Sequence, residues 1–421
     1  MGVLRYIKMT FIDDIKKSVL YIAVMVFSII IIFNTFNIIF NEQIVAYRSK
    51  EYMDMSKLVF IILAVSIMFI AFANSYYLED KFKEYAVITL SGRSVGEICI
   101  IVVIRNFIVT AISIVIGCLL GAITSVFVLN GISKLVGVNI NGNYISVEAL
   151  ILTTVIIFTE LESVFLINTG SIYKKSINEL VNRKKRAYIP DNRRVKINPI
   201  IYIIIYLLPL AVAVIPTSPE ERIKNISFAI IIGIFGIQGI IRYVIPGVIN
   251  NYRNGKKIAD KCKLIIASNL FFSIQKSIVL TLFLVVSSVL TISTAGQYRM
   301  GTVVNTMSLA CYILIIGIMS ITVVYKFLIE AKSRKENFEQ LKLLGYTKRE
   351  IKKIIQTEVV VYYAIIILLA LLYILIVALG SAMAGLMSIK LAIVVVMEYI
   401  IIFLTTAMVS LGEYKKIALL N

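Results

Sequence analysis

Ten long runs of apolar residues divide this chain, and they constrain its fold more than any other feature. A run of about 20 residues with few charges is long enough for a helix to cross the roughly 30 Å hydrocarbon core of a membrane. Hydrophobic residues make up 59% of the chain, whereas soluble domains hold about 45–50%. The sequence therefore predicts an all-α polytopic membrane protein with about ten transmembrane helices. The runs are 19–40, 58–78, 98–129, 147–170, 199–215, 226–245, 277–295, 307–329, 354–380 and 391–411.

The basic residues of the chain, which carries a net charge of +19, collect in alternate loops between these runs. Loops rich in Lys and Arg stay on the cytoplasmic side of a membrane, so both termini are expected in the cytoplasm. This topology accounts for the charge without a nucleic-acid partner. The densest basic segment, 174–196, favours contact with anionic lipid headgroups, and a dedicated protein contact is the alternative.

Several kinds of chemistry are excluded by what the sequence lacks. There is no histidine, and the four cysteines form no CxxC pair, so neither a zinc site nor a disulfide framework is expected. No phosphate-binding loop, dinucleotide fingerprint or serine-hydrolase elbow is present. We expect no enzyme activity and no cofactor on this chain, so any ATP and Mg²⁺ would be bound by a partner.

A phrase of nine residues at 90–98 returns at 343–351 with the shared pattern L-x-G-x-[ST]-x-x-E-I. Gly92 or Gly345 can adopt the left-handed conformation that ends one helix. A Ser or Thr two residues later, with Glu three residues beyond it, predicts a capping box that starts the next helix. The phrase therefore predicts a sharp elbow in each copy, capped by Ser94 with Glu97 and by Thr347 with Glu350.

The two elbows fall between the second and third crossings and between the eighth and ninth, which indicates an internal duplication. We expect a first four-helix repeat at 1–173 and a second at 277–421. The segment 174–276 would be a basic linker followed by two connector helices.

The charged stretch before each elbow contains an aromatic and an aliphatic residue on one helical face, Tyr85 with Ile88 and Phe338 with Leu341. Such a pair could anchor a short cytoplasmic helix in the groove of a partner protein. An interfacial helix resting on lipid is the alternative.

This pattern resembles the FtsX-like permease module of ABC transporters, at 84–92 and again at 337–345. The layout resembles the ten-helix bacitracin-type and antimicrobial-peptide permeases of the cytoplasmic membrane of Gram-positive bacteria. Those permeases carry a large extracellular domain, for which this chain has only residues 297–306. The resemblance implies a separate cytoplasmic ABC ATPase dimer that docks on coupling helices. These would include Phe82, Tyr85, Ile88, Leu90, Gly92, Phe338, Leu341, Leu343 and Gly345.

Charged residues within the apolar runs are the second group of candidates. Glu160, Glu162 and Glu398 could line a path for substrate or protons, or could pair with neighbouring polar side chains. Arg105 and Glu358 each follow their elbow glycine by thirteen residues. They could form an ion pair with each other, or extend separately to the membrane surface.

The leading hypothesis is a permease subunit that exports or extracts an amphipathic compound, such as a peptide antibiotic or a lipid-like molecule, with the energy of a partner ATPase. One alternative is an ATPase-coupled signalling or scaffold protein that acts on a sensor histidine kinase or an envelope enzyme. Another is an ion-coupled secondary transporter that uses the intramembrane glutamates and needs no ATPase.

Overall fold

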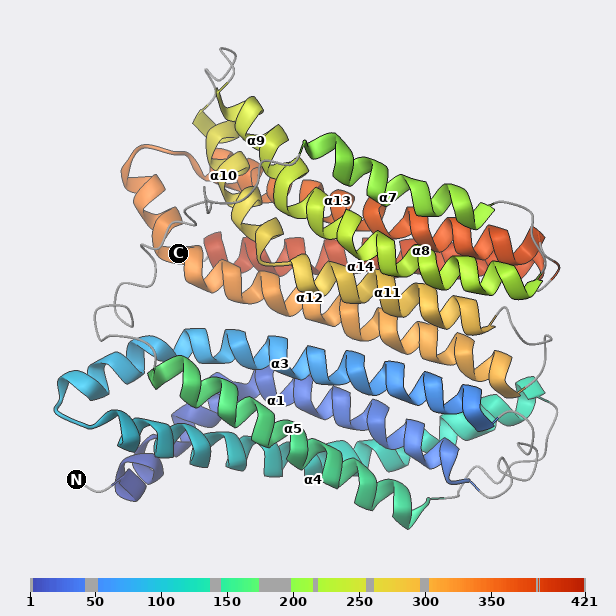
Figure 1. The fold of residues 1–421 in the computed structure, drawn as a ribbon. Helices are drawn as coiled ribbons and strands as arrows, with labels where there is room; N and C mark the ends of the chain where they lie inside the picture. The colour runs from blue at the N-terminus through green and yellow to red at the C-terminus, as the bar shows by residue number, and fades with distance from the viewer. Residues whose placement is uncertain are drawn as a thin grey trace. The chain divides into compact units, whose positions relative to one another are not determined.

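The computed structural model describes residues 3–41, 52–136, 145–173, 198–214, 219–254, 261–295, 303–383, 385 and 387–419 (Figure 1). Every regular element in these ranges is a helix, which confirms the all-α prediction. The chain divides into two compact units, Met1–Pro190 and Asp191–Asn421. The first unit contains α1 (Val3–Ile39), α3 (Tyr52–Leu90), α4 (Val95–Val136) and α5 (Val147–Tyr173).

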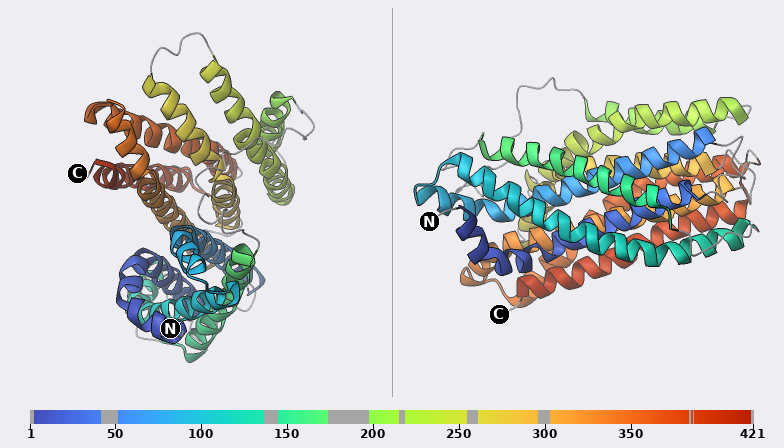
Figure 2. Two further views of the ribbon diagram at one scale, coloured as in Figure 1. Left: turned by 90° about the vertical axis from the view of Figure 1, so that its left-hand side faces the viewer. Right: turned by 90° about the horizontal axis from the view of Figure 1, so that it is seen from below.

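In the first unit α1 packs against α3, α4 and α5, and the left view of Figure 2 shows these helices gathered as a bundle. The share of the spanning window that is buried is 72% in α1 and 28% in α4, so α1 lies inside the bundle and α4 at its surface. Gly117 and Gly121 allow α1 and α4 to approach closely. A Cβ atom on Gly117 would lie 2.6 Å from Ile29, and one on Gly121 would lie 2.9 Å from Phe33.

The second unit has its core around α11 and α12, whose spanning windows are 67% and 61% buried. Around α12 pack α11 and α14, and α13 packs against α10, α11 and α14. The elements of this unit are α7 (Pro199–Val214), α8 (Pro219–Gly239), η2 (Ile240–Val244), α9 (Ile245–Asn254), α10 (Lys261–Gln275), α11 (Ile278–Ala295), α12 (Val303–Leu343), α13 (Lys348–Met383) and α14 (Ile389–Leu419).

Within this second unit α7 and α8 pack on each other, and α7 packs on α13 while α8 packs on α11. A Cβ atom on Gly236 of α8 would lie 2.7 Å from the backbone of Tyr206, so only glycine permits this approach of α7. The Tyr206 hydroxyl donates to the Leu369 carbonyl at 2.7 Å, and the Tyr373 hydroxyl donates to the Tyr206 carbonyl at 3.0 Å. After α8, one π-helical turn, η2, precedes Pro246, which has no N–H for a regular helical bond.

Nine helices of the described residues are long and apolar enough to cross a membrane, in agreement with a polytopic membrane protein. The other predicted crossing, 199–215, coincides with α7, whose 16 residues extend only about 24 Å. The basic linker expected at 174–196 lies outside the described residues, as do 297–302 of the loop between α11 and α12. The division of the chain into two repeats and a separate connecting segment at 174–276 stays a prediction. In the structure α7 and α8, which belong to that segment, lie in the same compact unit as the second repeat.

The helices that precede the two elbows are much longer than a membrane is thick. α3 has 39 residues and α12 has 41, so each extends about 60 Å, twice the hydrocarbon core. The charged stretches before the elbows are the ends of these two helices. The predicted coupling helices are thus continuous with the spanning helices, because no proline or glycine interrupts the chain between each spanning segment and its elbow, and their coupling role stays a prediction.

Candidate functional site: two elbows and the charges beside them

The first elbow joins α3 to α4 through Gly92, whose φ of 89° lies in the left-handed region. The Gly92 amide donates to the Thr89 carbonyl at 3.0 Å, which satisfies one of the last carbonyls of α3. The Ser94 amide donates to Glu97 Oε2 at 3.2 Å, and the Glu97 amide donates to Ser94 Oγ at 3.3 Å. These reciprocal bonds are a capping box at the start of α4.

The second elbow joins α12 to α13 with the same geometry. Gly345 also has a φ of 89°, and its amide donates to the Lys342 carbonyl at 3.1 Å. The Tyr346 amide donates to the Leu341 carbonyl at 3.0 Å, which completes a Schellman motif. The Thr347 amide donates to Glu350 Oε2 at 2.8 Å, and the Glu350 amide donates to Thr347 Oγ1 at 3.3 Å.

Replacing Gly345 by alanine is expected to destabilise the protein by about 1–2 kcal/mol, because a Cβ atom is strained at this positive φ. No atom lies within 4 Å of the place that the alanine Cβ atom would take, so the backbone conformation alone sets the cost. Gly412→Ala, in open space within α14, is the matched control and should stabilise by about 0.5–1 kcal/mol. Chemical unfolding of the purified variants measures both effects, and an unchanged stability of Gly345→Ala would contradict the elbow geometry.

The predicted anchors before the elbows are buried within their own units. Tyr85 is 1% exposed and Phe338 is 2% exposed. Tyr85 and Ile88 belong to a cluster with Leu78, Ala86, Ile98 and Val102, and the Phe338 ring lies 6.2 Å from the Tyr414 ring. Leu341 is half-buried, and the side chain of Phe82 lies outside the described part of the chain. The idea that Tyr85 and Phe338 seat in a partner's groove was therefore wrong, because each packs against helices of its own repeat.

The apolar residues that the elbows do expose are leucines at equivalent positions. Leu90 is 67% exposed and Leu343 is 88% exposed, and each stands two residues before its elbow glycine. Val87 and Leu344 extend these two surfaces. A pocket of about 240 Å³ beside the second elbow, between α10 and the end of α12, is lined in part by Leu341 and Leu344. Each elbow thus presents a small apolar surface among charged residues.

In the first unit an ion-pair chain joins the helices on the two sides of the elbow. Arg105 Nη2 on α4 lies 2.9 Å from Glu84 Oε1 on α3, and Lys81 Nζ lies 3.1 Å from Glu84 Oε2. Burial would raise the pKa of Glu84, but Arg105 and Lys81 hold it below its ordinary value. This carboxylate therefore stays ionised between two cations.

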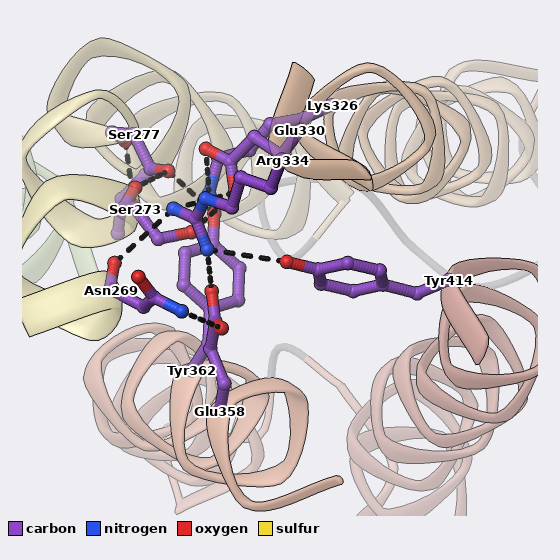
Figure 3. Close-up of polar contacts among 10 residues, drawn as sticks. Asn269, Ser273, Ser277, Lys326, Glu330, Arg334, Glu358, Tyr362 and Tyr414 are labelled. Carbon is purple, nitrogen blue, oxygen red and sulfur yellow. Dashed lines mark hydrogen bonds and ion pairs between the residues drawn. The ribbon is translucent and has the colours of Figure 1, made fainter. Parts of the chain in front are cut away.

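In the second unit a larger network occupies the corresponding place, and Figure 3 shows its side chains converging from α10, α12, α13 and α14. Arg334 on α12 forms an ion pair with Glu358 on α13, and its guanidinium also donates to the Tyr414 hydroxyl at 3.3 Å. Asn269 on α10 donates to Glu358 Oε2 at 3.1 Å. Because Glu358 is fully buried, these contacts replace the water that its carboxylate loses.

One turn of α12 further from the elbow, the same network holds a second pair. Lys326 Nζ lies 3.6 Å from Glu330 Oε1, donates to Ser273 Oγ at 2.7 Å and stands 3.7 Å from the centre of the Tyr362 ring. Ser273 Oγ in turn donates to Glu330 Oε2 at 2.9 Å. With Arg334 and Glu358 included, these contacts join two cations to two anions, and the charge of Lys276 also acts on Lys326 and Glu330.

The two repeats thus place charged residues at equivalent positions, with the same sign before the elbow and opposite signs after it. Lys81 and Arg334 each stand eleven residues before their elbow glycine, and Arg105 and Glu358 each stand thirteen residues after it. The hypothesis that Arg105 and Glu358 pair with each other is replaced by a partner within each repeat. Arg105 pairs with Glu84, and Glu358 pairs with Arg334. These two pairs could not be predicted from the duplication, because the acidic partner lies on α3 in the first repeat and on α13 in the second.

The three intramembrane glutamates differ in their surroundings. Glu160 on α5 is 5% exposed, and neither of its carboxylate oxygens has a hydrogen-bond partner among the described residues. Glu162 lies on the outer face of the same helix, and Glu398 on α14 is half-buried. Glu160 therefore has no hydrogen-bond partner among the described residues, and the choice between structural pairing and a path for substrate or protons stays a prediction.

Long apolar helices and two glycine elbows define a multi-pass helical membrane protein. Residues 56–161, which contain the first elbow, match the family described as FtsX-like permease C-terminal. The matched segment runs from α3 through α4 into α5 and is thus similar to a family of membrane permease components of ABC-type systems. No curated protein matches the chain.

Proposed function

We propose that this protein is the membrane-spanning subunit of an ABC transporter and that it works with a separate cytoplasmic ATPase dimer, which binds the ATP and Mg²⁺. The two elbows lie on the cytoplasmic side, with both termini, in a bacterial cytoplasmic membrane. The observation that carries the proposal is the repeated elbow itself. Two copies of one geometry suit a partner that is itself a dimer.

Leu90 and Leu343 are the contacts we assign to the ATPase. They are exposed at the ends of helices that extend beyond the hydrocarbon core, where water makes exposed leucine unfavourable. Burying them in a partner would remove that cost, and the charged residues beside them would form the rim of the contact. The flanking Tyr85 and Phe338 support the elbows from inside their own units.

The ion pairs explain how a force at the elbow would reach the membrane. Glu84–Arg105 and Arg334–Glu358 each join the helix before an elbow to the helix after it. A displaced elbow would therefore move both flanking helices as one body. In the second unit the network would also carry α10 and α14, because Asn269 and Tyr414 contact the same charges.

Affinity purification of the full chain in mild detergent tests the proposal. An ATPase should co-purify with the native chain and be reduced at least tenfold with the variant Leu90→Ser, Leu343→Ser, since two buried leucine contacts are lost. The control variant Leu119→Ser, Leu368→Ser changes two exposed leucines of α4 and α13 and should retain the ATPase. Equal retention by both variants would contradict docking at the elbows.

The transported compound is proposed to be amphipathic, a peptide antibiotic or a lipid-like molecule, as the resemblance to the antimicrobial-peptide permeases implies. Action on a sensor histidine kinase is the signalling alternative. Reconstituted vesicles distinguish the two, because a transporter with its ATPase moves a labelled peptide or lipid on addition of ATP, whereas a signalling protein does not.

A further inference from the structure

The pocket beside the second elbow combines an apolar wall with a positive charge. Its inner part includes Phe338, which is 2% exposed, and Arg334, whose side chain is 14% exposed. Leu344, which is 75% exposed, and the exposed Asn337 also line it. Among the described residues that line the pocket, Arg334 alone is charged. The pocket therefore suits an apolar side chain that has a negative charge close to it.

The position of the pocket along α12 determines which partner can reach it. The apolar run of α12 ends at residue 329, and Phe338 and Leu341 follow it by nine and twelve residues. At about 1.5 Å per residue they stand about 14–18 Å beyond the hydrocarbon core, whereas the headgroup layer is about 5–8 Å thick. A helix near the membrane normal therefore holds the pocket beyond the lipid headgroups, within reach of a protein on that side of the membrane.

Charge distinguishes the second elbow from the first. Residues 332–353 contain eight basic and three acidic residues, whereas the equivalent residues 79–100 contain three basic and four acidic ones. Lys348 and Arg349 are exposed directly after the second elbow, where the first elbow has a valine and a glycine. A surface with this excess of positive charge attracts an acidic partner and repels a basic one.

We propose that the second elbow binds an acidic segment of the ATPase whose apolar side chain enters this pocket. The first elbow contacts the ATPase through its exposed leucine without that charge attraction, so the two halves of the ATPase dimer are held unequally. This inference rests on the proposed function and identifies the kind of surface that the ATPase presents at one elbow. Asn269 and Arg334, which line the pocket, both contact Glu358 (Figure 3), so a side chain in the pocket touches the ion-pair network directly.

Photo-crosslinking in isolated membranes tests the charge attraction. A benzoylphenylalanine at Leu343 or at Leu90 is illuminated after a wash in about 0.05 M or about 0.5 M sodium chloride. The ATPase adduct from Leu343 should fall at least about fivefold at the higher salt concentration, whereas the adduct from Leu90 should change less than about twofold. Salt screens exposed charges, but it does not weaken a contact made by leucine.

Two charge variants locate the attraction at the second elbow. With the probe at Leu343, the variant Lys348→Gln, Arg349→Gln should lower the low-salt ATPase adduct at least about fivefold. The control variant Lys134→Gln, Lys390→Gln removes the same charge from two exposed lysines, each a whole helix away from an elbow, and should leave the adduct unchanged.

Two further variants test the pocket itself. Gln340→Trp places a large side chain at a lining position, and Asn337→Asp adds a negative charge there with little change of shape, so each should lower the Leu343 adduct about tenfold. Gln356→Trp, at an exposed glutamine of α13 outside the pocket lining, is the control and should retain the adduct. All three variants should keep the unfolding midpoint of the native chain, since the changed side chains are exposed.

The outcomes separate this inference from the proposed function. If neither elbow forms an ATPase adduct at either salt concentration, the proposed function is wrong and the inference falls with it. If both elbows form the adduct but the Leu343 adduct resists salt, or Gln340→Trp and Asn337→Asp bind like the native chain, the inference alone is overturned. A phospholipid adduct from Leu343 in place of the ATPase adduct also overturns it.

Discussion

Replacing Glu358 by methionine is expected to destabilise the second unit by about 3–5 kcal/mol. The change removes one of two anions from a buried network and leaves Lys326 and Arg334 with Glu330 alone. Asn269 also loses its acceptor at 3.1 Å. Unfolding in mixed detergent and dodecyl sulfate micelles measures the difference in free energy.

The double variant Arg334→Met, Glu358→Met is the matched control. It removes one charge of each sign, so Lys326 and Glu330 remain as a balanced pair at 3.6 Å. Replacement of both members of a buried ion pair by apolar groups is often nearly neutral, so the double variant should recover most of the lost stability. A double variant as unstable as Glu358→Met would contradict the account, because charge imbalance would then not be the cause.

Replacing Phe338 by alanine is expected to cost about 3–5 kcal/mol of stability, because the ring is 2% exposed and packs beside Tyr414. Leu343→Ala, only five residues later on the same helix, should change stability by no more than about 0.5 kcal/mol, since Leu343 is 88% exposed. The same unfolding measurement serves both variants.

This pair of variants distinguishes a residue that stabilises the elbow from inside the unit from a residue that binds the ATPase. A partner anchor at Phe338 would lower ATPase binding without lowering stability, which is the opposite of the expected result. We therefore expect Phe338→Ala to lower stability and Leu343→Ala to lower ATPase retention. If the Phe338→Ala variant is as stable as the native chain, burial of the Phe338 ring does not stabilise the second elbow.

The sequence predicted those features that depend on neighbouring residues. A glycine followed two residues later by Ser or Thr, and then by Glu, specifies a helix stop and a capping box through local hydrogen bonds, and both elbows have that geometry. The apolar runs likewise predicted the spanning helices, because their length and composition leave few alternatives.

Features that depend on long-range packing were not predictable in the same way. The spacing of Tyr85 and Ile88 shows that they share a helix face, but it does not show whether that face meets lipid, a partner or α4. The partner of Arg105 could not be inferred from the duplication either. Glu84 lies 21 positions earlier in the chain, and its equivalent in the second repeat is Asn337, which carries no charge.

One long-range contact did have a local signal in the sequence that our predictions missed. Gly117 and Gly121 are spaced as in the G-x-x-x-G pattern of closely packed membrane helices, and α4 uses them against Ile29 and Phe33 of α1. The unsatisfied state of Glu160, in contrast, depends on what three other helices place around it, and no pattern in α5 alone records that.

Site-specific photo-crosslinking at the elbows tests the central claim most directly. A benzoylphenylalanine placed at Leu90 or at Leu343 in intact cells should yield an adduct with a nucleotide-binding ATPase at both positions, because both side chains are exposed at the proposed contact. The same probe at Leu119, on the lipid-facing side of α4, should yield no such adduct. A normally accumulated chain that forms no ATPase adduct from either elbow would contradict the account.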